Sequence, residues 1–492
     1  MKRAKPSVRR ALSLSFTRSG ITFAFNVATV TIVSRLLTPS EVGVFSVAVA
    51  FVALVQMLRD FGVSEFIVQE RNLSHDVVRT AFTINLIIGW LLAAAVFGFS
   101  NLIGQFYGNP GVAQVAKVLS LVFLLMPFGT TTQSYMRRDM QFGLLVRIQT
   151  AETATRSITT IALAYLGFSY MSMAWGSVAA MGVVVIGCVI WGGEYRVSGL
   201  GVAEWKRVLH FGSNRTIADI AAQIGQQSAD IVVGRMLGMA AAGLYSRGYG
   251  VVNIFRVNFV RAVAAVAFPA YAREHREGNE APALFRKSVV YLTGVAWPFF
   301  AFAALMAAPL IHLAFGSQWM AAVPLMRWLC CAAIVGSLIY QVNGLLTAMG
   351  NYREVTWIEV EYQLVRVVLA ILAAFYSLEA VAASQILVYV VAVTLYYRKL
   401  FRHDALRPRV LIASLAPSAA LTVVSSIIPV AVLVLWPGTP GQHYVSEFLV
   451  AAGGAAVSWL AGLFLLKHPL SLEITNAATM LHERVRSTLR FN

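Results

Sequence analysis

Five polar residues recur at helical spacing inside an apolar stretch near the middle of the chain. Arg215, Asp219, Gln223, Gln226 and Asp230 are separated by four, four, three and four residues. At 3.6 residues per turn, this spacing puts all five side chains on one face of a helix. Charged groups in an apolar helix are costly unless they face water, a partner or a ligand. The stripe therefore predicts a polar path or binding site, in which Asp219 and Asp230 are candidates for coupling to protons or sodium.

A second, weaker stripe lies near the amino terminus. Arg18, Thr22, Asn26 and Thr29 also follow helical spacing, and Asn26 precedes Gln226 by 200 residues. Two helices with polar faces at matching depth would form a cleft when the faces meet. We therefore expect Arg18 and Asn26 to line the same site as the central stripe.

Most of the charges inside apolar stretches are positive. Eleven cations stand against five acids there: Arg18, Arg35, Lys117, Arg156, Arg215, Arg235, Arg247, Arg256, Arg261, Arg327 and Arg366, against Glu152, Asp219, Asp230, Glu359 and Glu361. This surplus predicts that an anion from outside the chain binds among the helices. The candidates for that contact are Arg18, Arg215, Arg256 and Arg261, and Glu152 is a third candidate for ion coupling.

Simpler interpretations stay open for individual charges. Arg18, Arg35 and Arg215 lie close enough to the ends of apolar runs for their side chains to reach lipid headgroups. Arg156 follows Glu152 by four residues, so the two can pair along one helix. The charges near residues 359 to 366 can form a structural cluster.

The elements that carry these residues are apolar runs long enough to cross a bilayer as helices. About fourteen of them are centred near residues 23, 50, 90, 123, 160, 181, 223, 254, 300, 337, 366, 388, 424 and 456. The mean hydropathy of +0.70 and a charged fraction of only 12% agree with a chain that is solvated by lipid. The fold class that we predict is an all-α integral membrane protein.

Positive charge alternates between the segments that connect these runs. Seven segments hold no lysine or arginine, while the eight on the other side hold 28 of the 39 in the chain. By the positive-inside rule, the rich side is cytoplasmic. Both termini are therefore predicted to be cytoplasmic, and the basic amino terminus with its long apolar run is predicted to be a retained first span rather than a signal peptide.

The sequence lacks the motifs that are typical of several classes of enzyme. The sequence has no phosphate-binding G-x-x-x-x-G-K-[ST] loop, no H-E-x-x-H motif and no cysteine pair at metal spacing. We predict no catalytic residues, no metal site and no cofactor. The net charge of +17 fits the topology and an anionic inner leaflet, so we expect no nucleic-acid partner.

A repeat appears when the chain is compared with itself at an offset of 200 residues. Arg35-Leu36-Leu37-Thr38 and, four residues later, Gly43-Val44-Phe45-Ser46 match Arg235-Met236-Leu237-Gly238 and Gly243-Leu244-Tyr245-Ser246. The offset corresponds to six spans, so we predict two parallel six-helix lobes followed by two more spans. The predicted boundaries are 1 to 205, 206 to 405, and 406 to 492 with its cytoplasmic tail.

Four sequence blocks also resemble a family. They are SRLLTPSEVGVFSVAVAF (34 to 51), RDFGVSEFIVQ (59 to 69), GRMLGMAAAGLYSRGYGV (234 to 251) and GSQWMAAVPLMR (316 to 327). Together they resemble the polysaccharide exporters and lipid-linked oligosaccharide flippases of the MATE-like (MOP) superfamily, of the colanic acid, teichuronic acid and succinoglycan type.

The resemblance implies a bacterial inner-membrane flippase that moves an undecaprenyl-pyrophosphate-linked repeat unit outward by alternating access. It also implies membrane lipids, a polysaccharide polymerase and export machinery as partners, in exopolysaccharide, O-antigen or capsule assembly. The alternative on the same fold is a multidrug cation antiporter, which would need an acid-rich cleft. A membrane-embedded glycosyltransferase, ligase or polymerase is a third class, and it usually carries a larger outer loop than any found here.

Overall fold

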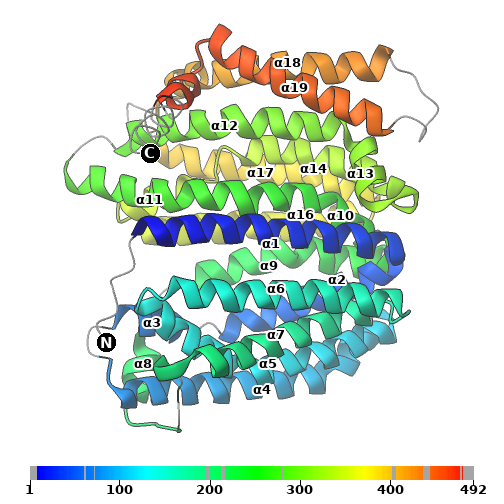
Figure 1. The fold of residues 1–492 in the computed structure, drawn as a ribbon. Helices are drawn as coiled ribbons and strands as arrows, with labels where there is room; N and C mark the ends of the chain where they lie inside the picture. The colour runs from blue at the N-terminus through cyan, green and yellow to red at the C-terminus, as the bar shows by residue number, and fades with distance from the viewer. Residues whose placement is uncertain are drawn as a thin grey trace, which may run out of the picture. The chain divides into compact units, whose positions relative to one another are not determined.

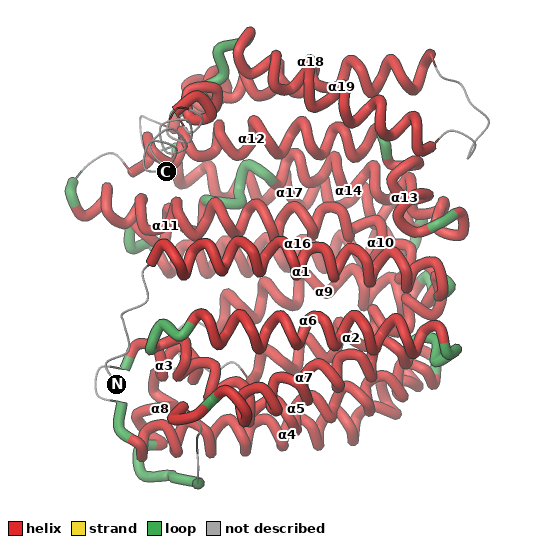
Figure 2. The backbone as a smooth tube through the Cα atoms, viewed as in Figure 1, coloured by secondary structure: helices red, strands yellow, loops and turns green. Residues whose placement is uncertain are grey.

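The chain folds into helices joined by short turns. The computed structural model describes residues 8 to 59, 63 to 70, 73 to 195, 197, 199 to 211, 216 to 278, 281 to 401, 406 to 435, 444 to 476 and 479. Helices and loops make up these residues, and no strand occurs among them (Figure 2). The predicted all-α class is therefore confirmed.

Figure 1 labels the helices in chain order. The α-helices are α1 (Val8–Leu36), α2 (Pro39–Arg59), α3 (Val63–Gln69), α4 (His75–Tyr107), α5 (Pro110–Arg138), α6 (Phe142–Tyr165), α7 (Met171–Trp191), α8 (Trp205–Phe211), α9 (Thr216–Met236), α10 (Met239–Phe255), α11 (Arg261–Arg276), α12 (Ala281–Leu305), α13 (Ala307–Phe315), α14 (Val323–Gly336), α15 (Val342–Ala348), α16 (Tyr352–Ala374), α17 (Leu378–Leu400), α18 (Pro408–Leu435) and α19 (Tyr444–Leu465). Two short 3₁₀ helices are η1 (Gly193–Tyr195) and η3 (Ser317–Ala322), and one π-helical turn is η2 (Arg256–Val260).

Ten helices in the described part of the chain are long and apolar enough to cross a membrane. They are α2, α4, α5, α7, the continuous α10 to α11 helix, α12, η3 with α14, α17, α18 and α19. Four other helices, α1, α6, α9 and α16, have 29, 24, 21 and 23 residues. These four also carry many of the intramembrane charges identified in the sequence, which lowers their hydropathy.

The chain forms two compact units, Met1–Ser246 and Arg247–Asn492. In the first unit α4 packs on α5, α6 on α7, α1 on α6, and α2 on α9. In the second unit α14 packs on α17, α12 on α18, and α18 on α19. The division into lobes at residues 205 and 405 follows from the repeat and stays a prediction.

Local sequence signals explain where several helices begin. Thr38 precedes α2, and its backbone N–H donates to Glu41 Oε2 at 2.7 Å while the Glu41 N–H donates to Thr38 Oγ1 at 3.4 Å. This reciprocal pair is a capping box, and Pro39 occupies the first helical position, where its missing N–H is harmless. Asn109 begins α5 in a similar way, since its Oδ1 accepts the Gly111 N–H at 2.8 Å before a first-turn proline. The family-like block around Thr38 therefore encodes a helix start.

Two glycines of the repeat permit a very close backbone contact within the first unit. A Cβ added to Gly43 would lie 1.7 Å from the Met239 carbonyl oxygen, and one added to Gly243 would lie 1.9 Å from the Pro39 carbonyl oxygen. The contact is reciprocal, because Pro39 and Met239 are equivalent at the 200-residue offset, as the two glycines are. No residue with a side chain fits at either glycine without a backbone shift.

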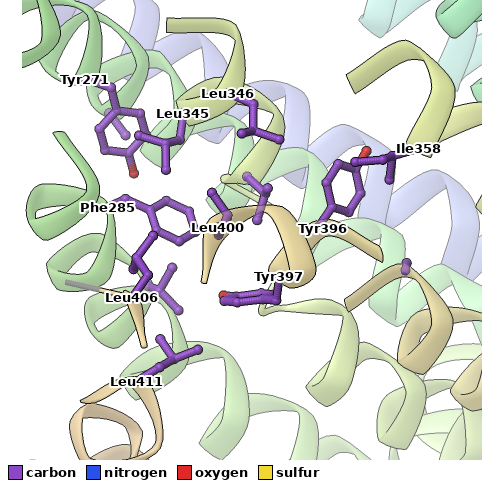
Figure 3. Close-up of a cluster of buried hydrophobic side chains, with 14 of the residues drawn as sticks. Tyr271, Phe285, Leu345, Leu346, Ile358, Tyr396, Tyr397, Leu400, Leu406 and Leu411 are labelled. Carbon is purple, nitrogen blue, oxygen red and sulfur yellow. The ribbon is translucent and has the colours of Figure 1, made fainter. Parts of the chain in front are cut away.

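The second unit has a large apolar core where α11, α12, α15 and α17 meet. Tyr271, Phe285, Leu345, Tyr397 and Leu400 pack there, each with an exposed fraction of 2% or less (Figure 3). The Tyr397 hydroxyl donates to the Leu338 carbonyl at 3.0 Å, so the buried phenol keeps a hydrogen bond. Through this core, α11, α12, α15 and α17 pack against one another within the second unit.

Candidate functional site

The central polar stripe lies on one continuous helix, α9. Asp219, Gln223, Gln226 and Asp230 all fall between Thr216 and Met236, while Arg215 lies outside the described residues. Gln223 is half-buried and Gln226 is exposed. The side chain of Asp219 also lies outside the description. The four residues from Asp219 to Asp230 therefore lie in one uninterrupted α-helix, and their spacing places them on one face of it.

Asp230 is a half-buried acid with one fully buried carboxylate oxygen. Its Oδ1 atom is buried and has no hydrogen-bond partner among the described residues. Beside it, the Tyr107 hydroxyl at the end of α4 donates to the Ile231 carbonyl at 3.2 Å. A buried carboxylate oxygen without a hydrogen bond is unfavourable, and a proton or a bound cation relieves that cost. The environment of Asp230 therefore favours binding of a proton or a cation.

The candidates on α1 are only partly described. Arg18 lies within the helix, but its side chain falls outside the description, and Asn26 is exposed. The Thr22 hydroxyl is buried without a hydrogen-bond partner among the described residues. The Thr29 hydroxyl donates to the Phe25 carbonyl at 2.7 Å, which satisfies it within the helix. Thr22 thus carries a buried hydroxyl without a hydrogen bond to the described residues, whereas the Thr29 hydroxyl is satisfied.

Arg256 and Arg261 frame the π-helical turn between α10 and α11. Arg256 is half-buried, and its Nη2 donates to Asn253 Oδ1 at 3.1 Å. Arg261 is exposed, and its backbone N–H donates to the Arg256 carbonyl. Both guanidinium groups belong to one helix that the hydropathy marks as a membrane span, Met239–Arg276. They are the best-described pair among the predicted anion contacts.

Glu152 has an internal partner. Arg156 Nη2 lies 2.9 Å from Glu152 Oε1, and Arg156 Nη1 donates to Ser177 Oγ on α7 at 3.4 Å. The helix-face pair expected from the four-residue spacing is present. Because its charge is already matched, Glu152 is a weaker candidate for ion coupling than Asp230.

Several intramembrane cations lie over aromatic rings. The sequence analysis did not predict these cation–π contacts. Four such contacts join a cation to a ring centroid: Lys117 to Phe97 at 6.0 Å, Arg235 to Phe106 at 5.2 Å, Arg247 to Trp319 at 5.5 Å, and Arg366 to Tyr389 at 5.3 Å. Each contact stabilises the cation by roughly 0.5–2 kcal/mol. Since a ring carries no net charge, these contacts leave the surplus of positive charge unchanged.

The sequence indicated Glu359 and its charged neighbours only as a structural cluster. Glu359 is 6% exposed and accepts hydrogen bonds at 2.9 Å from Tyr362 Oη, Gln363 Nε2 and Tyr396 Oη. Glu361 is exposed instead. The useful signal was the spacing of Glu359, Gln363 and Arg366 by four and three residues, which puts them on one helix face. The network joins α16 to α17.

Two cavities lie in the second unit. One of about 280 Å³ is lined by Val295, Pro298, Phe299, Phe302, Ser425, Ala455, Ala456 and Trp459, which come from α12, α18 and α19. The other, of about 530 Å³, lies between α11 and α12 and has Lys287, Tyr291 and Glu473 at its polar end. No group of three histidine, cysteine or acidic residues that would hold a metal occurs among the described residues.

The fold and these residues define a class of protein, a multi-pass α-helical membrane protein with cationic and acidic side chains inside its helices. A family model described as "Polysaccharide biosynthesis protein" matches residues 32 to 324. The chain belongs to this family, which confirms the predicted resemblance.

Curated relatives carry related names. The chain is 24% identical over 320 residues to "Lipopolysaccharide biosynthesis protein WzxC" of Escherichia coli, and the match covers 65% of each chain. It is 27% identical over 327 residues to "Succinoglycan biosynthesis transport protein ExoT" of Rhizobium meliloti, again covering 65% of each. It is 22% identical to "Teichuronic acid biosynthesis protein TuaB" of Bacillus subtilis over 60% of this chain and 62% of that one. The chain thus spans slightly less than two thirds of the length of these three relatives.

Solved structures show the same fold. The lipid II flippase MurJ in an inward closed conformation has a TM-score of 0.74 at 10% identity, covering 92% of this chain and 99% of that one. An inward-facing multidrug MATE transporter of the MOP superfamily has a TM-score of 0.63 at 16% identity, covering 78% and 95%. At these identities the likeness establishes the MATE-like fold and nothing further.

Proposed function

We propose that this chain is a flippase that moves a lipid-linked oligosaccharide, carried on undecaprenyl pyrophosphate, across the bacterial inner membrane. The relatives WzxC, ExoT and TuaB are named for lipopolysaccharide, succinoglycan and teichuronic acid biosynthesis, and MurJ is named as a lipid II flippase. The glycan would serve exopolysaccharide, O-antigen or capsule assembly, with polymerase and export machinery as partners. In this scheme the chain moves its substrate without catalysing a reaction, so it is not an enzyme.

The observation that carries the proposal is the surplus of cations inside helices of a MATE-like fold. Arg256 and Arg261 lie in a membrane-spanning helix, and the aromatic contacts made by other cations add no negative charge. A pyrophosphate would supply the balancing anion. The nearly all-apolar cavity between α12, α18 and α19 suits a polyprenyl or acyl chain.

Fourteen spans with both termini in the cytoplasm fit the described helices. The ten apolar helices and the four charge-bearing ones, α1, α6, α9 and α16, together make fourteen. An even number of spans agrees with the alternation of positive charge along the sequence. Two six-helix lobes with a cleft between them, alternately open to each side, complete the proposed architecture.

The membrane potential favours export of an anionic substrate. Moving one negative charge out of an inside-negative cell releases roughly 2.3 kcal/mol per 100 mV. A doubly charged pyrophosphate gains about twice that, and the emptied cationic site is drawn back toward the cytoplasm. A proton or sodium ion on Asp219, Asp230 or Glu152 would add a second driving force.

A multidrug cation antiporter is the second candidate, because the MATE transporters share the fold. Asp230, with its unpartnered buried oxygen, is the residue that favours it. Binding of drug cations requires negative charge in the cleft, and the cation surplus opposes that.

The test is translocation in proteoliposomes. The purified full chain is reconstituted with a fluorescent undecaprenyl-pyrophosphate oligosaccharide, and an inside-negative potential is imposed with potassium and valinomycin. We expect transfer of the substrate to the outer leaflet to rise with the potential and to be absent from protein-free vesicles. Transport of ethidium without movement of the glycolipid would favour the antiporter instead.

A further inference from the structure

The cavity between α11 and α12 has an apolar wall that one helix face supplies. Val263, Val266 and Ala270 line it from α11, and their spacing of three and four residues puts them on one side of that helix. Val266 is 75% exposed, so the cavity is open to the surroundings of the helix. Its volume of about 530 Å³ lies within the range of small-molecule sites, about 300–1,000 Å³. The cavity therefore has the size and the lining of a site for an apolar chain.

Two opposite charges stand at one end of this cavity. Lys287 on α12 and Glu473, in the helical turns that follow α19, are the charged residues among those that line it. Lys287 Nζ lies 3.9 Å from Glu473 Oε1, which is longer than the roughly 2.7–2.9 Å of a hydrogen-bonded ammonium and carboxylate. The two side chains are 58% and 51% exposed, and Tyr291 Oη donates to Glu473 Oε1 at 3.0 Å. Both charges are therefore accessible to the charged groups of a ligand.

These charges lie at the depth of lipid headgroups. Lys287 precedes Leu305, the last residue of α12, by 18 residues, which is about 27 Å along a helix and close to the roughly 30 Å hydrocarbon core of a bilayer. The Tyr271 hydroxyl hydrogen-bonds to Ser288 Oγ, so one end of the α11 wall lies beside Lys287. From Tyr271 the lining runs about 18 Å back to Phe259, toward the middle of the membrane. A headgroup at Lys287 thus places its acyl chain along this wall.

We propose that this cavity binds a molecule of phosphatidylethanolamine from the surrounding leaflet. Its phosphate pairs with Lys287, its primary ammonium pairs with Glu473, and an acyl chain lies along the α11 wall. One cation and one carboxylate match a zwitterion, whereas the anionic headgroup of phosphatidylglycerol leaves Glu473 opposite a negative charge. The quaternary ammonium of phosphatidylcholine has no N–H to donate to the carboxylate. The bound lipid is distinct from the transported substrate, so the site does not require the chain to be a flippase.

The experiment titrates the purified full chain in detergent with phosphatidylethanolamine, phosphatidylglycerol or phosphatidylcholine of identical acyl chains and measures bound lipid by native mass spectrometry. We expect the first phosphatidylethanolamine to bind at least about fivefold more tightly than either other lipid. Glu473→Gln should remove the preference over phosphatidylglycerol, and Lys287→Gln should weaken binding of both lipids. Arg273→Gln and Glu277→Gln are matched controls, because they break an exposed ion pair of 2.8 Å outside the cavity and should leave the preference unchanged.

A larger side chain on the wall tests whether the bound lipid lies in the cavity. Ala270→Leu should abolish the preference for phosphatidylethanolamine, and Ala262→Leu takes its place if that variant does not fold. Equal binding of the three lipids by the wild-type chain, or tighter binding of phosphatidylglycerol, would overturn the proposal. So would a preference that Glu473→Gln or the leucine variant leaves unchanged. Displacement of phosphatidylethanolamine by an equal amount of undecaprenyl phosphate would also contradict it, because the cavity would then hold the lipid carrier.

Discussion

Ser46 and Ser246, which are 200 residues apart in the chain, form a hydrogen bond between their hydroxyl oxygens at 3.2 Å. The bond lies one helical turn after the reciprocal contact of Gly43 and Gly243 and joins α2 to α10. Residues that match in the sequence repeat therefore touch each other in the fold.

Adding a methyl group at either glycine should disrupt this contact. Gly43→Ala or Gly243→Ala places a Cβ less than 2 Å from a backbone oxygen, and overpacking of this kind costs typically about 1–3 kcal/mol. We expect a lower melting temperature in detergent and less protein in the membrane, measured by fluorescence-detected size exclusion. Gly98→Ala on α4 and Gly250→Ala on α10 are matched controls, since nothing lies within 4 Å of either new Cβ. Equal losses of melting temperature and of membrane protein at all four positions would show that the close backbone contact does not determine stability.

His468 should make the second unit less stable at low pH. It follows α19 and is fully buried, its Nδ1 accepts the Leu470 N–H at 3.2 Å, and its Nε2 meets Ser418 Oγ on α18 at 3.0 Å. Burial lowers the pKa of His468 below 6.5, because the interior disfavours the charged imidazolium. Its contribution is therefore fully present above about pH 6.5 and is lost as the pH falls through the lower pKa of the folded state.

The measurement is the melting temperature of the purified chain between about pH 5 and pH 8. The wild-type chain should lose more stability on acidification than His468→Asn, which cannot titrate. Parallel pH curves for the two proteins would show that the histidine does not contribute.

Asp230 and Glu152 should respond differently to neutralisation. Asp230→Asn removes an acid whose Oδ1 has no partner among the described residues, so we expect unchanged or slightly higher stability. Glu152→Gln breaks a partly exposed pair with Arg156 and should cost about 0.2–0.5 kcal/mol. In proteoliposomes, Asp230→Asn should abolish the dependence of transport on a pH or sodium gradient while Glu152→Gln keeps it. The opposite pattern would move the coupling role from α9 to α6.

The proposed topology can be tested with reporter fusions. Alkaline phosphatase joined after Asn109 or after Gly441 should be active, and fusions after Arg276 or at Asn492 should be inactive, because positive charge marks the cytoplasmic side. Activity at Arg276 or silence at Asn109 would contradict the scheme of fourteen spans with both termini inside.

The all-α class and the ten apolar helices could be predicted from the sequence, because membrane helices need little more than length and hydropathy. The fourteen spans and the two six-helix lobes stay predictions. The glycines of the repeat and the capping box at Thr38 and Glu41 also lie within the blocks by which the sequence resembles its family. The pairing of Glu152 with Arg156 followed from spacing alone. The capping box and the Glu152–Arg156 pair join residues that are close in the chain, and the two glycines are related by the 200-residue offset of the repeat.

The remaining features depend on contacts between distant residues, which spacing cannot show. Arg247 rests on Trp319, and Glu359 accepts a hydrogen bond from Tyr396, only because the fold brings separate helices together. The π turn at Arg256 was hidden for another reason, since the run Arg-Val-Asn-Phe-Val has no glycine or proline to mark it. Arg18, Arg215 and the other predicted cleft residues stay predictions.

The most direct test of the central claim is polymer export at matched protein abundance in cells that lack the native gene. Arg18, Arg215, Arg256 and Arg261 are each replaced by Gln and by Lys. If they bind a pyrophosphate, Gln should cut export at least about tenfold, and Lys should restore it only in part, because it keeps the charge but loses the planar pair of donors. Normal export by all four Gln variants at normal abundance would contradict the anionic-substrate account.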